Sequence, residues 1–114
     1  MKDQEILING ETYIKKQKNY TLPYVIVRTY SAGVFAAYLK ERNGSEAILI
    51  NARRLWYWDG ASSLSQLSME GVSKPDKCKF PCEVDEILVL GVIEIINATE
   101  KCKKSIDGVS VWRQ

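Results

Sequence analysis

The sequence predicts an α+β protein with an antiparallel β-sheet core of about six strands, two short helices and self-association into oligomers. Short segments rich in β-branched and aromatic residues follow one another across tight turns, such as Ser31–Gly33 and Asn43-Gly44. Turns this short join neighbouring strands in antiparallel order. Only two segments have a helical pattern, and a length of 114 residues suits one domain.

The N-terminal residues are expected to form a hairpin or an arm. The prediction covers residues 5–16, because Asn9-Gly10 is the pair that type I′ hairpin turns prefer. We therefore expect a single domain over residues 1–114, in which residues 1–20 are the hairpin or arm and residues 23–114 are the core.

The strands of the core are predicted where β-branched and aromatic residues dominate. They span residues 24–30, 34–41, 46–51, 52–58, 83–89 and 90–97. The stretch from Ile87 to Ile96 is apolar on both faces except at Glu94. Such a stretch is usually covered by a helix on one face and by a sheet or a second copy on the other, so oligomers are expected.

Two short helices complete the predicted fold. Residues 62–70 carry apolar side chains at helical spacing and end before Gly71, a typical stop residue. Residues 98–106 follow Asn97, and Glu100 stands three positions after that asparagine, which is the pattern of a capping box.

The composition argues against catalysis and against a metal site. The chain has no histidine, which is the commonest general base and the commonest metal ligand. It has no glycine-rich phosphate loop and no dinucleotide-binding fingerprint. Its three cysteines, Cys78, Cys82 and Cys102, are one ligand short of a structural zinc site. We therefore expect a binding protein that is not an enzyme and has no cofactor.

Charge and cysteine content indicate the partners and the compartment. The 16 basic and 14 acidic side chains give a net charge of +2, too little to hold long nucleic acid by charge alone. The polar N-terminus and the lack of a long apolar run predict neither a signal peptide nor a membrane span. An odd number of cysteines favours a reducing compartment, so we expect the cytoplasm.

The run from Arg53 to Trp58 is the strongest candidate for a ligand site. Alternation along a strand puts Arg54, Trp56 and Trp58 on one face and Arg53 on the other. A guanidinium can pair with a phosphate while the indoles stack on a base. The alternative is that the two tryptophans are core residues that an arginine covers by a cation–π contact.

A second candidate is the strand end beside the Ser31–Gly33 turn. Arg28 lies among apolar residues and needs a carboxylate, a phosphate or solvent, because an unpaired buried charge is costly. The N–H groups of the turn could cradle an anion. The alternative partners of Arg28 are Glu41, Glu46 and Glu94. The full candidate ligand-binding set is Arg28, Ser31, Gly33, Arg53, Arg54, Trp56, Trp58, Phe80 and Arg113.

Several blocks of the sequence resemble one class of small phage and prophage proteins. The blocks are Tyr24–Phe35, Asn51–Ala61, Ser63–Leu67, Val92–Ile96 and Thr99–Lys101. The resemblance covers residues 23–112, and its central block is quite specific. This class is similar to the anti-Thoeris sponge proteins, which bind a cyclic ADP-ribose isomer made by a bacterial TIR defence enzyme and hold it without cleaving it. Some sponges also bind cyclic oligonucleotide signals at a separate site in an oligomer.

The resemblance implies a phage-encoded protein that sequesters a cyclic nucleotide or a cyclic ADP-ribose-type immune signal. It would do so in the cytoplasm of the host bacterium, as a dimer or a hexamer. Two alternatives stay open. The strand-turn-strand pattern of residues 24–58 is also similar to an Sm-like β-core, which implies an oligomeric binder of RNA or single-stranded nucleic acid. A protein–protein inhibitor would instead use the tryptophans as interface anchors.

Overall fold

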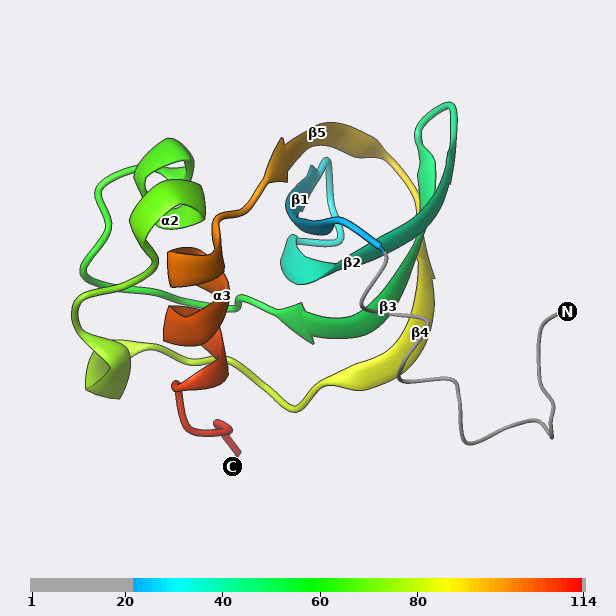
Figure 1. The fold of residues 1–114 in the computed structure, drawn as a ribbon. Helices are drawn as coiled ribbons and strands as arrows, with labels where there is room; N and C mark the ends of the chain where they lie inside the picture. Colours follow the sequence, from blue (N-terminus) through cyan, green and yellow to red (C-terminus); the bar gives the residue numbers. More distant parts are fainter. Residues whose placement is uncertain (1–21, 114) are drawn as a thin grey trace, which may run out of the picture.

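The computed structural model describes residues 22–113, and the hairpin predicted over residues 5–16 lies outside them. It confirms the α+β class, with an antiparallel sheet and two short α-helices in the described range (Figure 1). The strands are β1 (Tyr24–Thr29), β2 (Val34–Asn43), β3 (Glu46–Arg54), β4 (Val84–Val89) and β5 (Val92–Asn97). The helices are α2 (Leu64–Glu70) and α3 (Glu100–Asp107), with a short 3₁₀ helix, η2 (Pro75–Lys77), between them.

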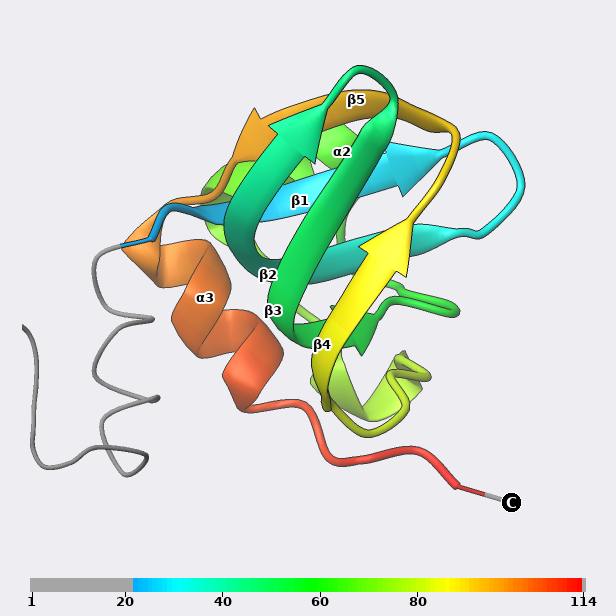
Figure 2. The same cartoon turned by 90° about the vertical axis from the view of Figure 1, so that its right-hand side faces the viewer.

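The strands form one sheet in the order β4-β3-β2-β1-β5, and all of these pairings are antiparallel. The strands β4 and β5 lie at opposite edges, although only Leu90 and Gly91 connect them. Because consecutive Cα atoms are about 3.8 Å apart, so short a link brings the two edges together. The sheet therefore curls into an incomplete barrel, as Figures 1 and 2 show from two directions.

The described residues form five strands where about six were predicted, because the segments 46–51 and 52–58 share one strand as far as Arg54. Asn51 has a φ of 51°, and the register between β2 and β3 shifts beside it. An irregularity of this kind bends a strand without ending it. Residues 52–54 therefore continue the strand of residues 46–51 and do not begin a new one.

Side chains that alternate along the strands fill a hydrophobic core on each face of the sheet. The inner core lies inside the barrel and includes Val25 and Phe35. The outer core lies between the sheet and the helices and includes Ile26 of β1, Leu67 of α2 and Ile106 of α3. Because β1 is an internal strand with a core on each side, most of its residues are buried.

Each α-helix begins at a side chain that caps it. Ser63 accepts a hydrogen bond from the N–H of Gln66, as a serine N-cap does. The N-cap of α3 is Thr99, whose Oγ1 accepts a hydrogen bond from the N–H of Cys102. The capping box predicted at Asn97 is therefore wrong, because that residue still belongs to β5.

The helices α2 and α3 pack against each other on the outer side of the sheet (Figure 1). Gly71 ends α2 with a φ of 78° and lies so close to Ser105 of α3 that an added Cβ would overlap the serine side chain. The Ser105 hydroxyl also bonds the N–H and the carbonyl of Val72. Position 71 therefore requires glycine both for its backbone angle and for the close approach of α3.

The stretch from Ile87 to Ile96, predicted to be covered on both faces, is divided between the two edge strands. In a single copy of the chain, Leu88, Leu90 and Ile93 are exposed. These side chains therefore face solvent in the single chain, and their coverage by a second copy stays a prediction. No helix in the described range is long and apolar enough to cross a membrane.

Candidate functional site

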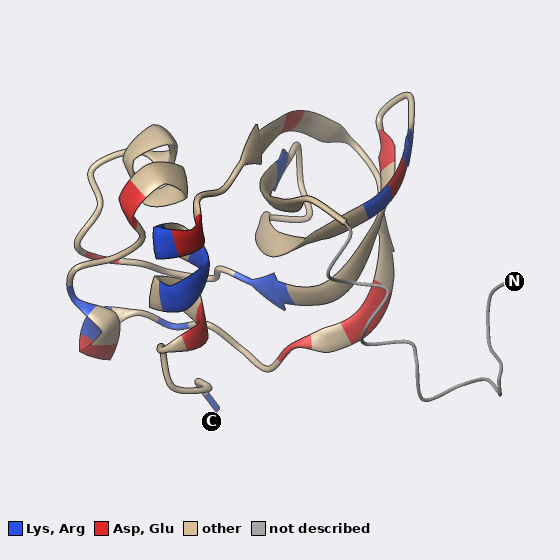
Figure 3. Ribbon diagram, viewed as in Figure 1, with Lys and Arg blue, Asp and Glu red and all other residues tan. Residues whose placement is uncertain are grey.

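Arg53 and Arg54 end β3, where Figure 3 shows a basic strand end, and alternation correctly predicted that only one of them is buried. Arg53 is 6% exposed and donates hydrogen bonds to backbone carbonyls only. The acceptors are Phe80 (3.1 Å), Pro81 (3.0 Å), Ile106 (2.8 Å) and Val109 (2.7 Å).

These bonds make Arg53 a structural clamp. They use four of the five N–H donors of its guanidinium. Burial lowers the pKa of this group, yet an arginine stays protonated in a protein. Since Arg53 joins β3 to three other segments and has little left to offer a ligand, we remove it from the candidate site.

Arg54 presents its guanidinium at one end of the barrel, above a ring of the inner core. Its Cζ lies 4.7 Å from the ring centroid of Phe35, a cation–π contact that holds the side chain in place. Gly33 lies beside it, because a Cβ built on this glycine would be 4.0 Å from Nε of Arg54. Arg54 is exposed and forms no ion pair with another described residue. Its charge is available to an anion from solvent.

The turn beside Arg54 is organised by Thr29. The Thr29 hydroxyl donates to the carbonyl of Gly33 and accepts from the N–H of Ala32, both at 2.8 Å. The hydrogen bonds among the described residues leave the N–H groups of Ser31 and Gly33 unused. Because Gly33 lies beside the Arg54 guanidinium, its free N–H and that side chain are suited to an anion such as a phosphate.

The aromatic residues after Arg54 do not keep strict alternation. Trp56 is 65% exposed, whereas Leu55 before it is buried. Tyr57 is exposed as well, because the chain has left the sheet. Trp58 is half-buried and packs against the outer core. Of the two predicted tryptophans, one is therefore available to a ligand and the other is a core residue.

The other predicted residues lie apart from this group. Arg28 pairs with Glu94 across β1 and β5, with 2.8 Å between Nε and Oε1. Phe80 is fully buried, with the guanidinium of Arg53 5.5 Å from its ring centroid. Arg113 is exposed near the end of the described chain. The candidates that the structure leaves accessible are Gly33 beside Arg54, Ser31 of the same turn, and Trp56 two residues after Arg54, and we call these four residues the turn site.

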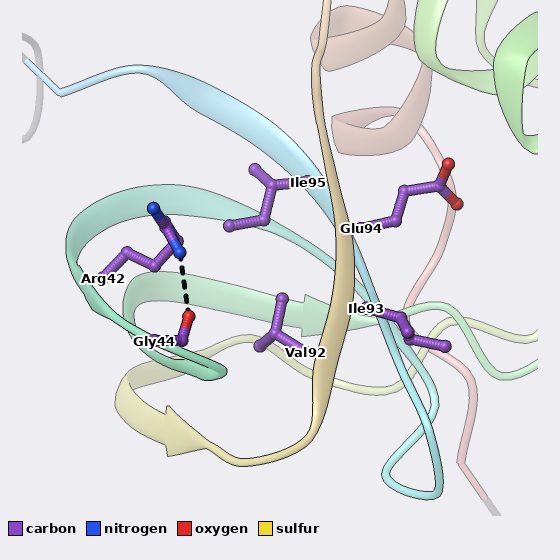
Figure 4. A pocket seen from close by; sticks show the side chains of 6 residues that line it. All are labelled: Arg42, Gly44, Val92, Ile93, Glu94 and Ile95. Atoms are coloured by element: carbon purple, nitrogen blue, oxygen red, sulfur yellow. Dashed lines mark hydrogen bonds between the residues drawn. The ribbon is translucent and has the colours of Figure 1, made fainter.

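A pocket of about 200 Å³ lies elsewhere, between the β2–β3 hairpin and β5 (Figure 4). Its lining residues are Arg42, Gly44, Val92, Ile93, Glu94 and Ile95. Nη1 of Arg42 donates to the carbonyl of Gly44 at 2.8 Å, so this arginine is tied to its own hairpin. Ligand pockets are usually larger, about 300–1,000 Å³. The sequence could not indicate this pocket, because its two walls meet only when the sheet curls.

A second aromatic group was also missed. Tyr57, Lys79 and Trp112, which we call the ring–lysine cluster, come from three separate segments. The Nζ atom of Lys79 lies 5.9 Å from the ring centroid of Tyr57 and 5.8 Å from a ring centroid of Trp112. The three residues are far apart in the sequence, so no local pattern could have identified the cluster.

Cys78 and Cys102 are buried, whereas Cys82 is exposed. Burial, followed by the negative charge of Asp107, raises the pKa of the Cys102 thiol to about 11, and burial raises the pKa of Cys78. Both thiols are therefore protonated at neutral pH and poor nucleophiles. Within residues 22–113, no three side chains of Cys, Asp or Glu gather closely enough to hold a metal ion.

Comparison with protein families gives one match. A family model described as Domain of unknown function (DUF6948) matches residues 22–106. This range contains the whole sheet and the turn site, and it ends before the segment that carries Trp112. Comparison with curated proteins and with solved structures gives no match.

Proposed function

The chain belongs to the DUF6948 family, and we propose that it binds a nucleotide at the turn site and holds it without chemical change. The observation that carries this proposal is the placement of Arg54. Its guanidinium is held over Phe35, has no carboxylate partner among the described residues, and lies beside Gly33, whose N–H is unused. An exposed, positioned and unpaired arginine is well suited to a phosphate.

The two parts of a nucleotide would meet different parts of the turn site. The phosphate would accept hydrogen bonds from the Arg54 guanidinium and from the N–H groups of Ser31 and Gly33. The base would stack on Trp56, which is 65% exposed and follows Arg54 by two residues. Stacking of one base on an aromatic ring contributes about 1–3 kcal/mol to the free energy of binding, so Trp56 would add substantially to the affinity.

We propose a cyclic nucleotide or a cyclic ADP-ribose-type immune signal as the ligand. The support is the resemblance to anti-Thoeris sponge proteins together with the phosphate-binding chemistry of Arg54. Sequestration depends on slow release, and a surface that stays open to solvent releases its ligand quickly. We therefore propose that a dimer or a hexamer covers the turn site, in the cytoplasm of a phage-infected bacterium.

The second candidate function is binding of RNA or single-stranded DNA. The observation that favours it is the presence of two exposed rings in succession, Trp56 and Tyr57, next to Arg54 and Lys79. Exposed rings and cations on an open surface are typical of proteins that bind single strands. This function predicts an affinity that grows with strand length and falls steeply with salt.

The proposed function can be tested by recovering the ligand. Purified protein is incubated with cyclic ADP-ribose isomers produced by a TIR enzyme, separated from free ligand by filtration, and then heated. The proposal predicts that heat releases the isomer unchanged, in an amount comparable to the protein. The same incubation is made with cyclic nucleotides. Failure to retain any of these ligands, or release of a cleaved product, would contradict the proposal.

A further inference from the structure

We infer that the ring–lysine cluster is a second stacking position, so that the ligand of this chain carries two bases joined by phosphate. Of the two proposed ligand classes, this favours a cyclic nucleotide with two bases over cyclic ADP-ribose, which has one base. The inference rests on the proposed function of the turn site. It concerns three residues, Tyr57, Lys79 and Trp112, that contribute nothing to the turn site itself.

The cluster is a built arrangement. Tyr57 and Lys79 exchange backbone hydrogen bonds of 3.3 Å and 2.7 Å, which set their side chains opposite each other. The N–H of Trp112 donates to the carbonyl of Phe80 at 2.9 Å, and this bond holds the C-terminal segment against the neighbour of Lys79. The lysine ammonium consequently lies within 6 Å of both rings.

The buried side chain of Arg53 supports this arrangement. Its Nη2 donates both to the carbonyl of Phe80, at 3.1 Å, and to the carbonyl of Val109, at 2.7 Å. These two carbonyls belong to the two segments that present Lys79 and Trp112. The positions of the lysine and the indole are therefore tied to a buried side chain and do not depend on surface contacts alone.

The chemistry of the cluster suits a base and a phosphate. Lys79 is exposed and has no carboxylate partner among residues 22–113, so its charge can meet an anion. Tyr57 is 50% exposed and offers a ring face for stacking. The two stacking positions are adjacent in the chain, because Trp56 of the turn site and Tyr57 of the cluster are consecutive residues.

The cluster also gives the C-terminal segment a role in specificity. Trp112 lies beyond residues 22–106, which the family model matches. The turn site lies within that range, whereas one ring of the cluster is supplied by a segment outside it. We expect the C-terminal segment to set the preference for a dinucleotide over a mononucleotide, while the turn site sets the affinity for the mononucleotide.

The test compares AMP with the linear dinucleotide pApA, each titrated into the full-length wild type and the Trp112→Ala variant. The wild type should bind pApA at least about 10-fold more tightly than AMP, because a second base stacks. Trp112→Ala should lose most of that difference and keep the affinity for AMP within about twofold. Val111→Ala, in the same segment, is the control and should behave as the wild type.

A second variant covers the case in which Trp112→Ala does not fold. Tyr57→Ala removes the opposite, more exposed ring and should abolish the same preference. Equal affinity of the wild type for AMP and pApA, or an unchanged preference in folded variants of both kinds, would overturn the inference and leave the turn site intact. If the wild type bound neither AMP nor pApA, the result would instead contradict the proposed nucleotide binding, and the inference with it.

Discussion

Arg53 and Arg54 are consecutive residues of β3 with opposite environments, the first buried and bonded to backbone carbonyls, the second exposed above Phe35. The buried guanidinium joins the end of β3 to the C-terminal end of α3 through the carbonyl of Ile106, 2.8 Å away. A cation near the C-terminus of a helix is also favoured by the helix dipole. The pair therefore divides two tasks, one holding the fold and the other open to a ligand.

Replacement of Arg53 by alanine should destabilise the protein severely. The change leaves the carbonyl of Val109 without a donor among the described residues and leaves the carbonyl of Phe80 with only the N–H of Trp112. An unsatisfied buried carbonyl costs about 1–3 kcal/mol. We expect a loss of about 3–5 kcal/mol in the free energy of unfolding, measured by urea denaturation. Arg54→Ala is the matched control and should change stability by less than about 1 kcal/mol. Similar losses for the two variants would contradict the clamp.

Replacement of Gly71 by alanine should also destabilise the fold. The φ of 78° is unfavourable for alanine, and the new methyl group would overlap the side chain of Ser105. We expect a cost of at least about 2 kcal/mol, from overpacking and backbone strain together. Gly44→Ala is a suitable comparison because it has a similar φ of 62° and open space around it. Equal decreases in melting temperature for the two variants would show that backbone strain, and not the overlap with Ser105, causes the loss of stability.

Stability should fall at alkaline pH because of Cys102. Its pKa is about 11 in the folded protein, against an ordinary value of 9.0. The stabilising contribution is complete below pH 9 and is lost as the pH rises through the folded pKa, because the unfolded chain releases its proton first. The expected loss between about pH 9 and 11 is on the order of 2 kcal/mol.

The control for this pH dependence is Cys102→Ala. Tyr24 has a pKa raised mainly by burial, and the pKa of Lys103 is raised mainly by its hydrogen bond to Asp107, so both add to the alkaline loss in the wild type. The variant loses the contribution of the thiol and keeps that of Lys103. It also keeps the main part of the Tyr24 contribution, because burial is the largest cause of that shift and the charge of Cys102 a lesser one. Its free energy of unfolding should therefore fall less steeply above pH 9, and identical slopes would argue against the assignment.

Trp56 should matter for binding and not for stability. With 65% of the residue exposed, Trp56→Ala should leave the unfolding transition almost unchanged and lower nucleotide affinity by about 5- to 100-fold. Trp56→Phe should keep most of the affinity, since it retains a ring. Leu88→Ala, which alters a similarly exposed residue on β4, should have no effect on affinity. Quenching of tryptophan fluorescence by AMP offers a direct measurement.

The sequence predicts the strands well because their side chains follow local rules. The β-branched segments and glycine turns place β1, β2, β4 and β5 within a few residues of their observed bounds. Asn51 shows the limit of this approach, since an asparagine with positive φ fits either a turn or a bulge. The choice depends on whether β2 continues alongside, which is a long-range property of the sheet.

The candidate site is predicted only in part for the same reason. Alternation shows that Arg53 and Arg54 point to opposite sides, but not which one is buried. That depends on the carbonyls of Ile106 and Val109, which reach Arg53 only after α3 packs on the sheet. The pairing of Arg28 with Glu94 likewise depends on β1 meeting β5, the last strand of the chain.

The most direct test of nucleotide binding at the turn site is calorimetric titration of one cyclic ADP-ribose isomer and of AMP into three proteins. The proteins are the wild type, Arg54→Ala and Arg42→Ala. Arg42 is the control because it lies near the end of β2, whereas Arg54 pairs with Phe35 near the start of that strand. The account predicts micromolar or tighter binding of at least one nucleotide to the wild type and to Arg42→Ala, and a loss of at least about 10-fold in Arg54→Ala. Absence of heat with the wild type, or equal affinity in both arginine variants, would contradict it.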